Sequence, residues 1–204
     1  MRGFSSLAFT PAVKAAQARW GSRRTYARLE RGETTPDTLG EDEASFLAER
    51  DSFYMASVGS SGWPYIQHRG GERGFVHVLD ERTLAFADYR GNRQYITVGN
   101  VEGDDRVALI FVDYPARARL KILARARIIA RSDDPDLFAR VAGDTAAERV
   151  FVLRVEGIDW NCPQHITPRY TEHEVDELVR PLLDENEALK RELEALRKES
   201  ERRS

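Results

Sequence analysis

Residues 53–71 read FYMASVGSSGWPYIQHRGG, and this stretch decides the fold class. Phe53 to Val58 and Tyr65 to Arg69 have the composition of β-strands. The Gly/Ser segment at 59–62 lies between them, and such a segment is typical of a tight turn. The stretch therefore predicts an antiparallel β-hairpin.

Further strand-like segments follow the hairpin at similar spacing. They are Gly74 to Leu79, Thr83 to Asp88, Arg106 to Asp113, Leu120 to Ala130 and Val150 to Val155. Short turns join most of these segments, which favours an antiparallel barrel or sandwich over alternating βα units with a parallel sheet. The longer connection between Asp88 and Val107 has room for a short helix at Gln94 to Gly99.

The same connection carries Gly91-Asn92-Arg93 directly before the expected helix. Backbone N–H groups at a helix start have no internal partner, and together with the helix dipole and an arginine they favour an anion such as phosphate. The residues alone leave a second interpretation open. In that interpretation Arg90 and Arg93 are solvated surface charges, and Gly91 only permits a turn.

Composition sets broad limits on function. The chain has 204 residues, of which 41% are hydrophobic and 32% charged, and its net charge is −3, which is typical of one globular domain with flanking segments. One cysteine excludes an internal disulfide and an all-thiolate metal site, so we expect no metal and a cytoplasmic location. Apolar runs are far shorter than the ~18 residues of a membrane span. Interspersed acids and bases argue against nucleic-acid binding.

Differences in composition and residue pattern divide the chain into three expected regions. They are a helical N-terminal lead at 1–42, a strand-rich domain at 43–170 and an amphipathic, coiled-coil-like tail at 171–204. In the lead, Thr10 as N-cap and Pro11 at the first helical position predict a helix start, and Gly21 is placed to end that helix.

Two rows of residues repeat every seven positions in the tail. The first row is Val175, Leu182, Leu189 and Leu196, and the second is Val179, Asn186 and Leu193. This is an a/d pattern with a polar residue at one a position. Thr171-x-x-Glu174 predicts a capping box, and Pro181 predicts a kink or a new helix start, with a regular stretch from Leu182 to Lys198. Both a solvated helix packed on its own domain and a coiled coil with a second subunit fit the pattern.

Three segments together resemble the pyridoxamine 5′-phosphate oxidase superfamily of flavin split barrels over residues 44–169. They are FYMASVGSSGWPYIQHRGG, FADYRGNRQYITVGN and LKILARARII. GNRQY and NCPQHITPR are similar to the oxidase-related, FMN-binding branch of that superfamily. The resemblance implies a mainly β (α+β) fold, a six-stranded antiparallel split β-barrel with flanking helices and a C-terminal helical tail. It also implies a homodimer with FMN at the subunit interface, where each site uses residues of both chains.

The resemblance further implies which residues bind FMN. Asn92 and Arg93, preceded by Gly91, correspond to the loop that holds the flavin phosphate. Other positions that correspond to cofactor contacts are Arg69, His77, Ala87, Asp88, Arg119, Lys121, Trp160 and Arg169. Among them, Arg69, Arg119 and Lys121 are candidates for a cation beside the flavin ring.

Departures from the family pattern argue against pyridoxamine phosphate oxidation itself. DPDLFARVAGD at 134–144 lacks the family's pattern of a Tyr and an Arg that hold that substrate, and Gln164 to Pro168 lacks an Arg-x-His. We therefore expect an FMN-dependent oxidoreductase that acts on another small organic molecule. A non-catalytic flavin carrier or sensor, a deazaflavin-binding barrel and a haem-binding barrel with His77, His165 or His173 as ligand are the alternatives.

No catalytic side chain is assigned, because in flavin enzymes the cofactor itself transfers the hydride. His165 is a candidate proton donor or substrate ligand, and a structural hydrogen-bonding role is the other interpretation. Cys162 beside it is a candidate redox thiol, but its reactivity depends on surroundings that the sequence does not define.

Overall fold

The computed structural model describes residues 3–30, 37–160 and 164–203 of the chain. They form two compact units. The first contains six helices and seven strands, and the second contains the turn Tyr114–Arg117 and the segment from His165 onward with helix α7 (Glu172–Arg203). The helices of the first unit are α1 (Phe4–Ala8), α2 (Pro11–Arg19), α3 (Arg23–Glu30), α4 (Glu41–Ala48), α5 (Ile96–Gly103) and α6 (Pro135–Ala142).

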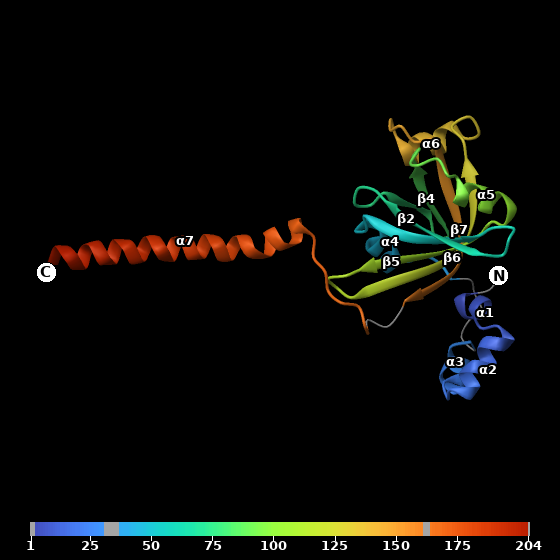
Figure 1. The fold of residues 1–204 in the computed structure, drawn as a ribbon, viewed down its shortest axis with the longest axis horizontal. Coiled ribbons are helices and arrows are strands. Elements are labelled where there is room, and N and C mark those ends of the chain that lie inside the picture. Colours follow the sequence, from blue (N-terminus) through green and yellow to red (C-terminus); the bar gives the residue numbers. More distant parts are fainter. Residues whose placement is uncertain (1–2, 31–36, 161–163, 204) are drawn as a thin grey trace. The chain divides into compact units, whose positions relative to one another are not determined.

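All seven strands belong to one antiparallel sheet (Figure 1). They are β1 (Ser52–Val58), β2 (Pro64–Gly70), β3 (Val76–Asp80), β4 (Thr83–Asp88), β5 (Arg106–Asp113), β6 (Ala118–Ile129) and β7 (Arg149–Trp160). Their order is β2-β1-β5-β6-β7-β4-β3, and β1 pairs with β2 as the expected hairpin. The six strands that the resemblance implied were one too few: all seven segments found in the sequence pair in one sheet, with β2 and β3 at its edges.

The sheet curls around one core. Strands β1 and β4 are four steps apart in the sheet order, which in a flat sheet corresponds to about 19 Å. Yet Phe53 of β1 meets Phe86 of β4 edge to face at 5.2 Å between ring centroids. Phe111 and Phe75 also stack on Phe53, at 4.7 and 5.7 Å. A bulge where Leu123 and Ala124 pair with β7 helps the two longest strands to bend.

Each face of β4 meets a different core. Leu84 and Phe86 enter the main core, whereas Ala85 faces a smaller cluster around Phe138 of α6. Alternation along the strand therefore places Asp88 on the side of the main core and Ala87 on the side of α6.

Two of the helix starts expected from the sequence lie in the first unit. Thr10 Oγ1 accepts a hydrogen bond from the Val13 N–H, which confirms the predicted cap of α2. Helix α5, expected at Gln94 to Gly99, instead begins at Ile96 and runs to Gly103. The expected start was wrong because Tyr95 has a left-handed backbone (φ 52°), which cannot continue an α-helix.

Helix α7 is one continuous helix of 32 residues. Its start confirms the capping box, since Thr171 Oγ1 accepts from Glu174 N–H and Glu174 Oε2 accepts from Thr171 N–H. A kink or a new start was expected at Pro181, and the new start was wrong because one helix runs through this residue. On an exposed helix, water can satisfy the carbonyl that proline leaves without a donor. Despite its length α7 is too polar for a bilayer, and no helix in the described ranges could cross one.

The N-terminal lead is tied to strand β7. Asp37 Oδ2 accepts hydrogen bonds from the N–H groups of Phe4 and Ile158, both at 2.8 Å. Gly157 lies beneath α1, and a Cβ at this position would come within 2.7 Å of the Phe4 Cα. The absence of a side chain at Gly157 thus allows α1 to lie directly on the sheet.

Gly157→Ala is expected to lower the free energy of unfolding by about 1–3 kcal/mol, because backbone atoms must move to admit the new methyl group. Urea denaturation measures the change. Gly99→Ala is the control, since nothing lies within 4 Å of its added Cβ and alanine is the better helix former. Equal unfolding midpoints for both variants would contradict the close packing of α1.

Candidate functional site

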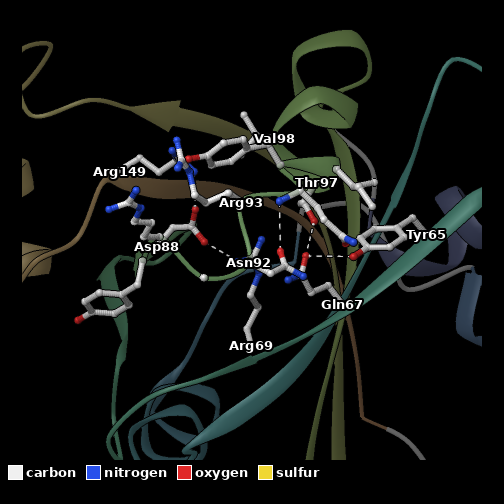
Figure 2. A pocket seen from close by; sticks show the side chains of 15 residues that line it. Tyr65, Gln67, Arg69, Asp88, Asn92, Arg93, Thr97, Val98 and Arg149 are labelled. Carbon is white, nitrogen blue, oxygen red and sulfur yellow. Dashed lines mark hydrogen bonds and ion pairs between the residues drawn. The ribbon is translucent and has the colours of Figure 1, made fainter.

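A cavity of about 250 Å³ lies where β2, the end of β4, the start of α5 and the start of β7 meet (Figure 2). We call it the arginine pocket. Its charged lining residues are Arg69, Asp88, Arg90, Arg93 and Arg149. The remaining lining includes Tyr65, Gln67, Gly91, Asn92, Gln94, Tyr95 and Thr97. The lining thus contains four guanidinium groups and one carboxylate.

Asp88 organises two of these arginines. It is buried, with 5% of its surface exposed, at the last position of β4. One carboxylate oxygen accepts from Arg69 at 2.5 Å, and the other accepts from Arg149 at 3.0 Å. These two ion pairs link β4 to β2 and to the start of β7, and they fix the position of each guanidinium group.

Aromatic rings hold the same two guanidinium groups. Arg69 lies over the rings of Phe86 and Phe151, at 5.8 and 5.3 Å from their centroids. Its Nε is buried and has no hydrogen-bond partner among the described residues. A buried donor without a partner costs free energy, so Arg69 retains an unused capacity to donate beside the pocket.

Arg149 stays charged in this setting. Its guanidinium lies 4.8 Å from the centroid of the Tyr95 ring, and it also donates to Glu148 at 2.6 Å. Desolvation by burial is the largest single effect and acts to lower its pKa. The hydrogen bond with Tyr95 and the charges of Asp88 and Glu148 outweigh it, so the pKa of Arg149 is raised above its ordinary value.

The loop from Tyr89 to Tyr95 has an unusual backbone. Gly91, Arg93 and Tyr95 have positive φ angles of 48°, 61° and 52°, with one residue between each pair. Left-handed residues that alternate with other conformations are typical of loops whose N–H groups converge on an anion. Asn92 Oδ1 accepts from the Gln94 N–H at 3.2 Å and supports this turn. The loop is therefore a candidate anion-binding loop.

Sequence reasoning missed part of the lining. Gln67 Oε1 accepts hydrogen bonds from Thr97 and Tyr65 at 3.1 and 3.4 Å, which joins β2 to α5. Tyr65, Gln67 and Arg69 alternate along β2, so the strand period could have identified the first two. Arg149 gave no such signal, because it follows Asp88 by 61 residues.

The structure brings five of the predicted residues together in the arginine pocket: Arg69, Asp88, Gly91, Asn92 and Arg93. His77 and Ala87 line a separate cavity of about 510 Å³ beside α6. Tyr89 borders both cavities.

Arg119 and Lys121 alternate on β6 with the buried Leu120 and Ile122, so they share the opposite face of the strand. Lys121 forms an ion pair with Asp159 at 3.4 Å. Arg119 has a buried Nε with no hydrogen-bond partner among the described residues. Neither residue lines the arginine pocket of its own chain.

The remaining predicted residues have other surroundings. Trp160 Nε1 donates to Glu43 Oε1 at 2.6 Å, and the ring packs edge to face on Phe46. Arg169 belongs to the second unit, where its guanidinium lies 4.9 Å from the centroid of the Tyr114 ring. His165 belongs to the same unit and has a left-handed backbone (φ 64°). Cys162 lies outside the described residues.

A curled antiparallel sheet with an arginine-lined pocket at the end of β4 defines the chain as a split-barrel protein. The family model described as pyridoxamine 5′-phosphate oxidase matches residues 39–161, more than half of the chain, and the chain belongs to this family.

Solved structures with a similar fold have low sequence identity. A putative pyridoxamine 5′-phosphate oxidase from Lactobacillus delbrueckii is 22% identical, with a TM-score of 0.49, over 62% of this chain and 97% of that one. HutZ, a haem storage protein from Vibrio cholerae, is 17% identical, with a TM-score of 0.44, over 59% and 93%. An F420 reductase is 18% identical, with a TM-score of 0.42, over 59% and 98%. No curated protein matches the sequence.

Proposed function

We propose that this protein binds FMN, with the flavin phosphate in the arginine pocket, and is an oxidoreductase for a small organic molecule other than pyridoxamine phosphate. The observation that carries the proposal is the excess of arginine over carboxylate around a left-handed Gly-Asn-Arg loop at the start of α5.

The charges of the pocket fit a phosphate. Asp88 is shared by Arg69 and Arg149, and Arg149 also pairs with Glu148, so two carboxylates balance these two arginines. Arg90 and Arg93 also line the pocket, and neither forms an ion pair with any residue in the described part of the chain. A phosphate monoester carries about −1.5 to −2 charges at neutral pH and would balance this excess. Guanidinium groups bind such oxygens through two parallel hydrogen bonds.

The roles of the residues follow from their contacts. Arg93 and the N–H groups of its loop would bind the phosphate, while Asp88 holds Arg69 and Arg149 at fixed positions beside it. Bound FMN would supply hydride or electron transfer, and the protein would supply orientation and charge. The α6 helix carries no tyrosine and one arginine, Arg140, which is exposed. This composition supports a substrate other than pyridoxamine phosphate.

An exposed apolar face supports the further proposal of a homodimer. Tyr54, Ala56, Ile66, Ala108 and Ile110 line a groove of about 180 Å³ on the outer face of the sheet, and Ile66 is 62% exposed. Lys121 lines the same groove. A second copy seated on this face would bury the apolar side chains, and Lys121 of one chain would then contribute to the surroundings of the partner's flavin.

In a chain that lacks Pro181 to Ser204, so that α7 cannot hold two copies together, Ile66→Asp is expected to convert a dimer to a monomer at micromolar concentration, because it places a charge at the centre of the apolar face. Sedimentation velocity measures the change. Ser61→Asp, at the exposed tip of the β1–β2 turn, is the matched control and should remain dimeric. Deletion of Pro181 to Ser204 alone should leave a dimer. A dimeric Ile66→Asp protein in the shortened chain would contradict this interface.

The absorption spectrum of the purified protein tests the proposed function. It is recorded alone, after addition of FMN, and after anaerobic addition of NADH or NADPH. We expect flavin bands that are bleached by the nicotinamide. Bound flavin that is not bleached would require a second titration with dithionite and candidate organic substrates, and flavin that no substrate reduces or reoxidises would favour a carrier or sensor.

Two other outcomes would overturn the choice of cofactor. An intense Soret band after addition of haem, with no response to FMN, would indicate a haem-binding barrel. Of the proposed haem ligands, His77 lines the second cavity, whereas His173 pairs with Glu177 on the exposed surface of α7. Binding of a deazaflavin, which lacks the long-wavelength flavin band, would keep the phosphate pocket and replace FMN.

A further inference from the structure

Helix α7 exposes a continuous apolar stripe. No described residue of this 32-residue helix is buried. Leu182, Leu189 and Leu196 are 64%, 57% and 57% exposed, and they lie on one side at intervals of seven residues. A shallow groove of apolar lining runs along the same side from Asn186 to Leu196. Such a helix gains little stability by itself in water and is stabilised by a partner that covers its apolar side.

We propose that α7 forms a parallel, in-register, two-stranded coiled coil with α7 of a second copy of this chain. The proposal does not depend on flavin binding. Its first support is the core pattern: leucine occupies the d positions 182, 189 and 196, and the a positions are Val179, Asn186 and Leu193. Valine at a with leucine at d favours two parallel strands.

Asn186 specifies the register. It occupies the a position between Val179 and Leu193, where a single buried polar residue costs stability unless it meets a hydrogen-bonding partner. In a parallel in-register pair Asn186 faces Asn186 of the partner subunit, so the two amides can bond to each other. A shift by one heptad would place each amide against valine or leucine.

The flanking charges select the parallel orientation. Glu185 and Glu192 occupy g positions, and Lys190 and Arg197 occupy the e positions five residues later. In a parallel pair, residue g of one helix meets the following e of its partner, so both contacts join opposite charges. In an antiparallel pair, g meets g and e meets e, which would oppose Glu to Glu and Lys to Arg.

The apolar part of the tail extends the same arrangement toward its start. Leu178 at g and Leu183 at e are 63% and 59% exposed, and a parallel pairing joins them across the interface. Pro181 falls at position c, which faces away from the partner. The proline ring therefore stays outside the interface.

Disulfide cross-linking of the full-length chain tests the arrangement. In a Cys162→Ser background, Leu196→Cys places a thiol at a d position near the C-terminal end, and Lys198→Cys places one on the outer side as the matched control. Under mild oxidation we expect about tenfold more covalent dimer with Leu196→Cys, because only facing positions approach disulfide distance. Equal yields at the two positions, or no dimer at Leu196→Cys, would overturn the proposal.

Orientation is tested by mixing Leu182→Cys and Leu196→Cys chains, made distinguishable by a tag on one of them. A parallel pair should give 182–182 and 196–196 products. A predominant 182–196 product would show an antiparallel pair and overturn the proposal. Because this readout depends on positions in α7, it is independent of dimerisation through the sheet face and of flavin binding.

Charge exchange tests the flanking pairs. Glu185→Lys with Glu192→Lys makes one chain positive at all four flanking positions, and Lys190→Glu with Arg197→Glu makes the other negative. Each variant carries Leu196→Cys and Cys162→Ser. When the two are co-expressed, we expect the mixed covalent dimer to exceed the random half of the product, whereas a random distribution would contradict the charge pairing.

Discussion

Replacement of Asp88 by alanine is expected to lower the free energy of unfolding by about 3 kcal/mol, near the lower end of the range for a broken buried ion pair. The side chains of Arg69 and Arg149 are only 14% and 17% exposed, so both would lose their common partner inside the fold. Arg149 retains Glu148, whereas among the described residues Arg69 retains its contacts with two aromatic rings. The loss should therefore fall mainly on the placement of Arg69.

Urea denaturation measures the change in the free energy of unfolding, and two further variants serve as comparisons. Asp88→Asn keeps the shape and part of the hydrogen bonding, so its stability should lie between those of the wild type and Asp88→Ala. Asp105→Ala removes an ion pair of similar length, 2.6 Å to Arg125, whose side chains are 45% and 52% exposed. An exposed pair contributes about 0–1 kcal/mol. If Asp88→Ala cost no more than Asp105→Ala, Asp88 would not organise the pocket.

Arg93→Ala is expected to weaken FMN binding about 30- to 150-fold. This is the loss of about 2–3 kcal/mol that follows removal of a charge-assisted hydrogen bond to phosphate. Arg93 lines the pocket and has no ion pair among the described residues, so its removal should leave no buried charge without a partner. Its left-handed backbone is strained equally by arginine and alanine, so the fold should be unaffected. Fluorescence titration measures the affinity.

Riboflavin separates the phosphate contact from the rest of the site. It has the ring and ribityl chain of FMN without the phosphate, so the wild type and Arg93→Ala should bind it with equal affinity. If Arg93→Ala lost affinity equally for FMN and riboflavin, Arg93 would not act through the phosphate. If its affinity for FMN were unchanged, Arg93 would not belong to the binding site. Arg93→Lys should recover part of the FMN affinity, because lysine keeps the charge and loses the bidentate geometry.

Local features of the fold were predictable because local sequence causes them. The β1–β2 hairpin follows from two strand-forming segments around a Gly/Ser turn, and the caps at Thr10 and Thr171 follow from side chains three residues from the N–H groups they bind. The helix after Asp88 was predicted with the wrong start. Its first residue depends on the left-handed conformation of Tyr95, which nothing in the composition of the segment demands.

Part of the site was predictable for the same reason. Gly91, Asn92 and Arg93 lie in one short loop, and a resemblance of motif was enough to identify them. Ala87 and Asp88 were both expected beside the cofactor from the family resemblance, yet adjacent strand residues face opposite sides. The alternation of side chains along β4 places the two residues on opposite faces of the strand. Only the packing of α6 shows that the face of Ala87 is covered by the second hydrophobic cluster.

The sequence by itself determined the seven strand segments, the loop before α5 and the heptad rows of α7, because each depends on the period or chemistry of neighbouring residues. Only the tertiary structure decided that Asp88 meets Arg69, 19 residues away, and Arg149, 61 residues away. The strand period shows which side chains share a face, but it does not show which faces meet. That choice depends on the order of strands and on the curvature of the sheet, and both depend on how the aromatic core packs.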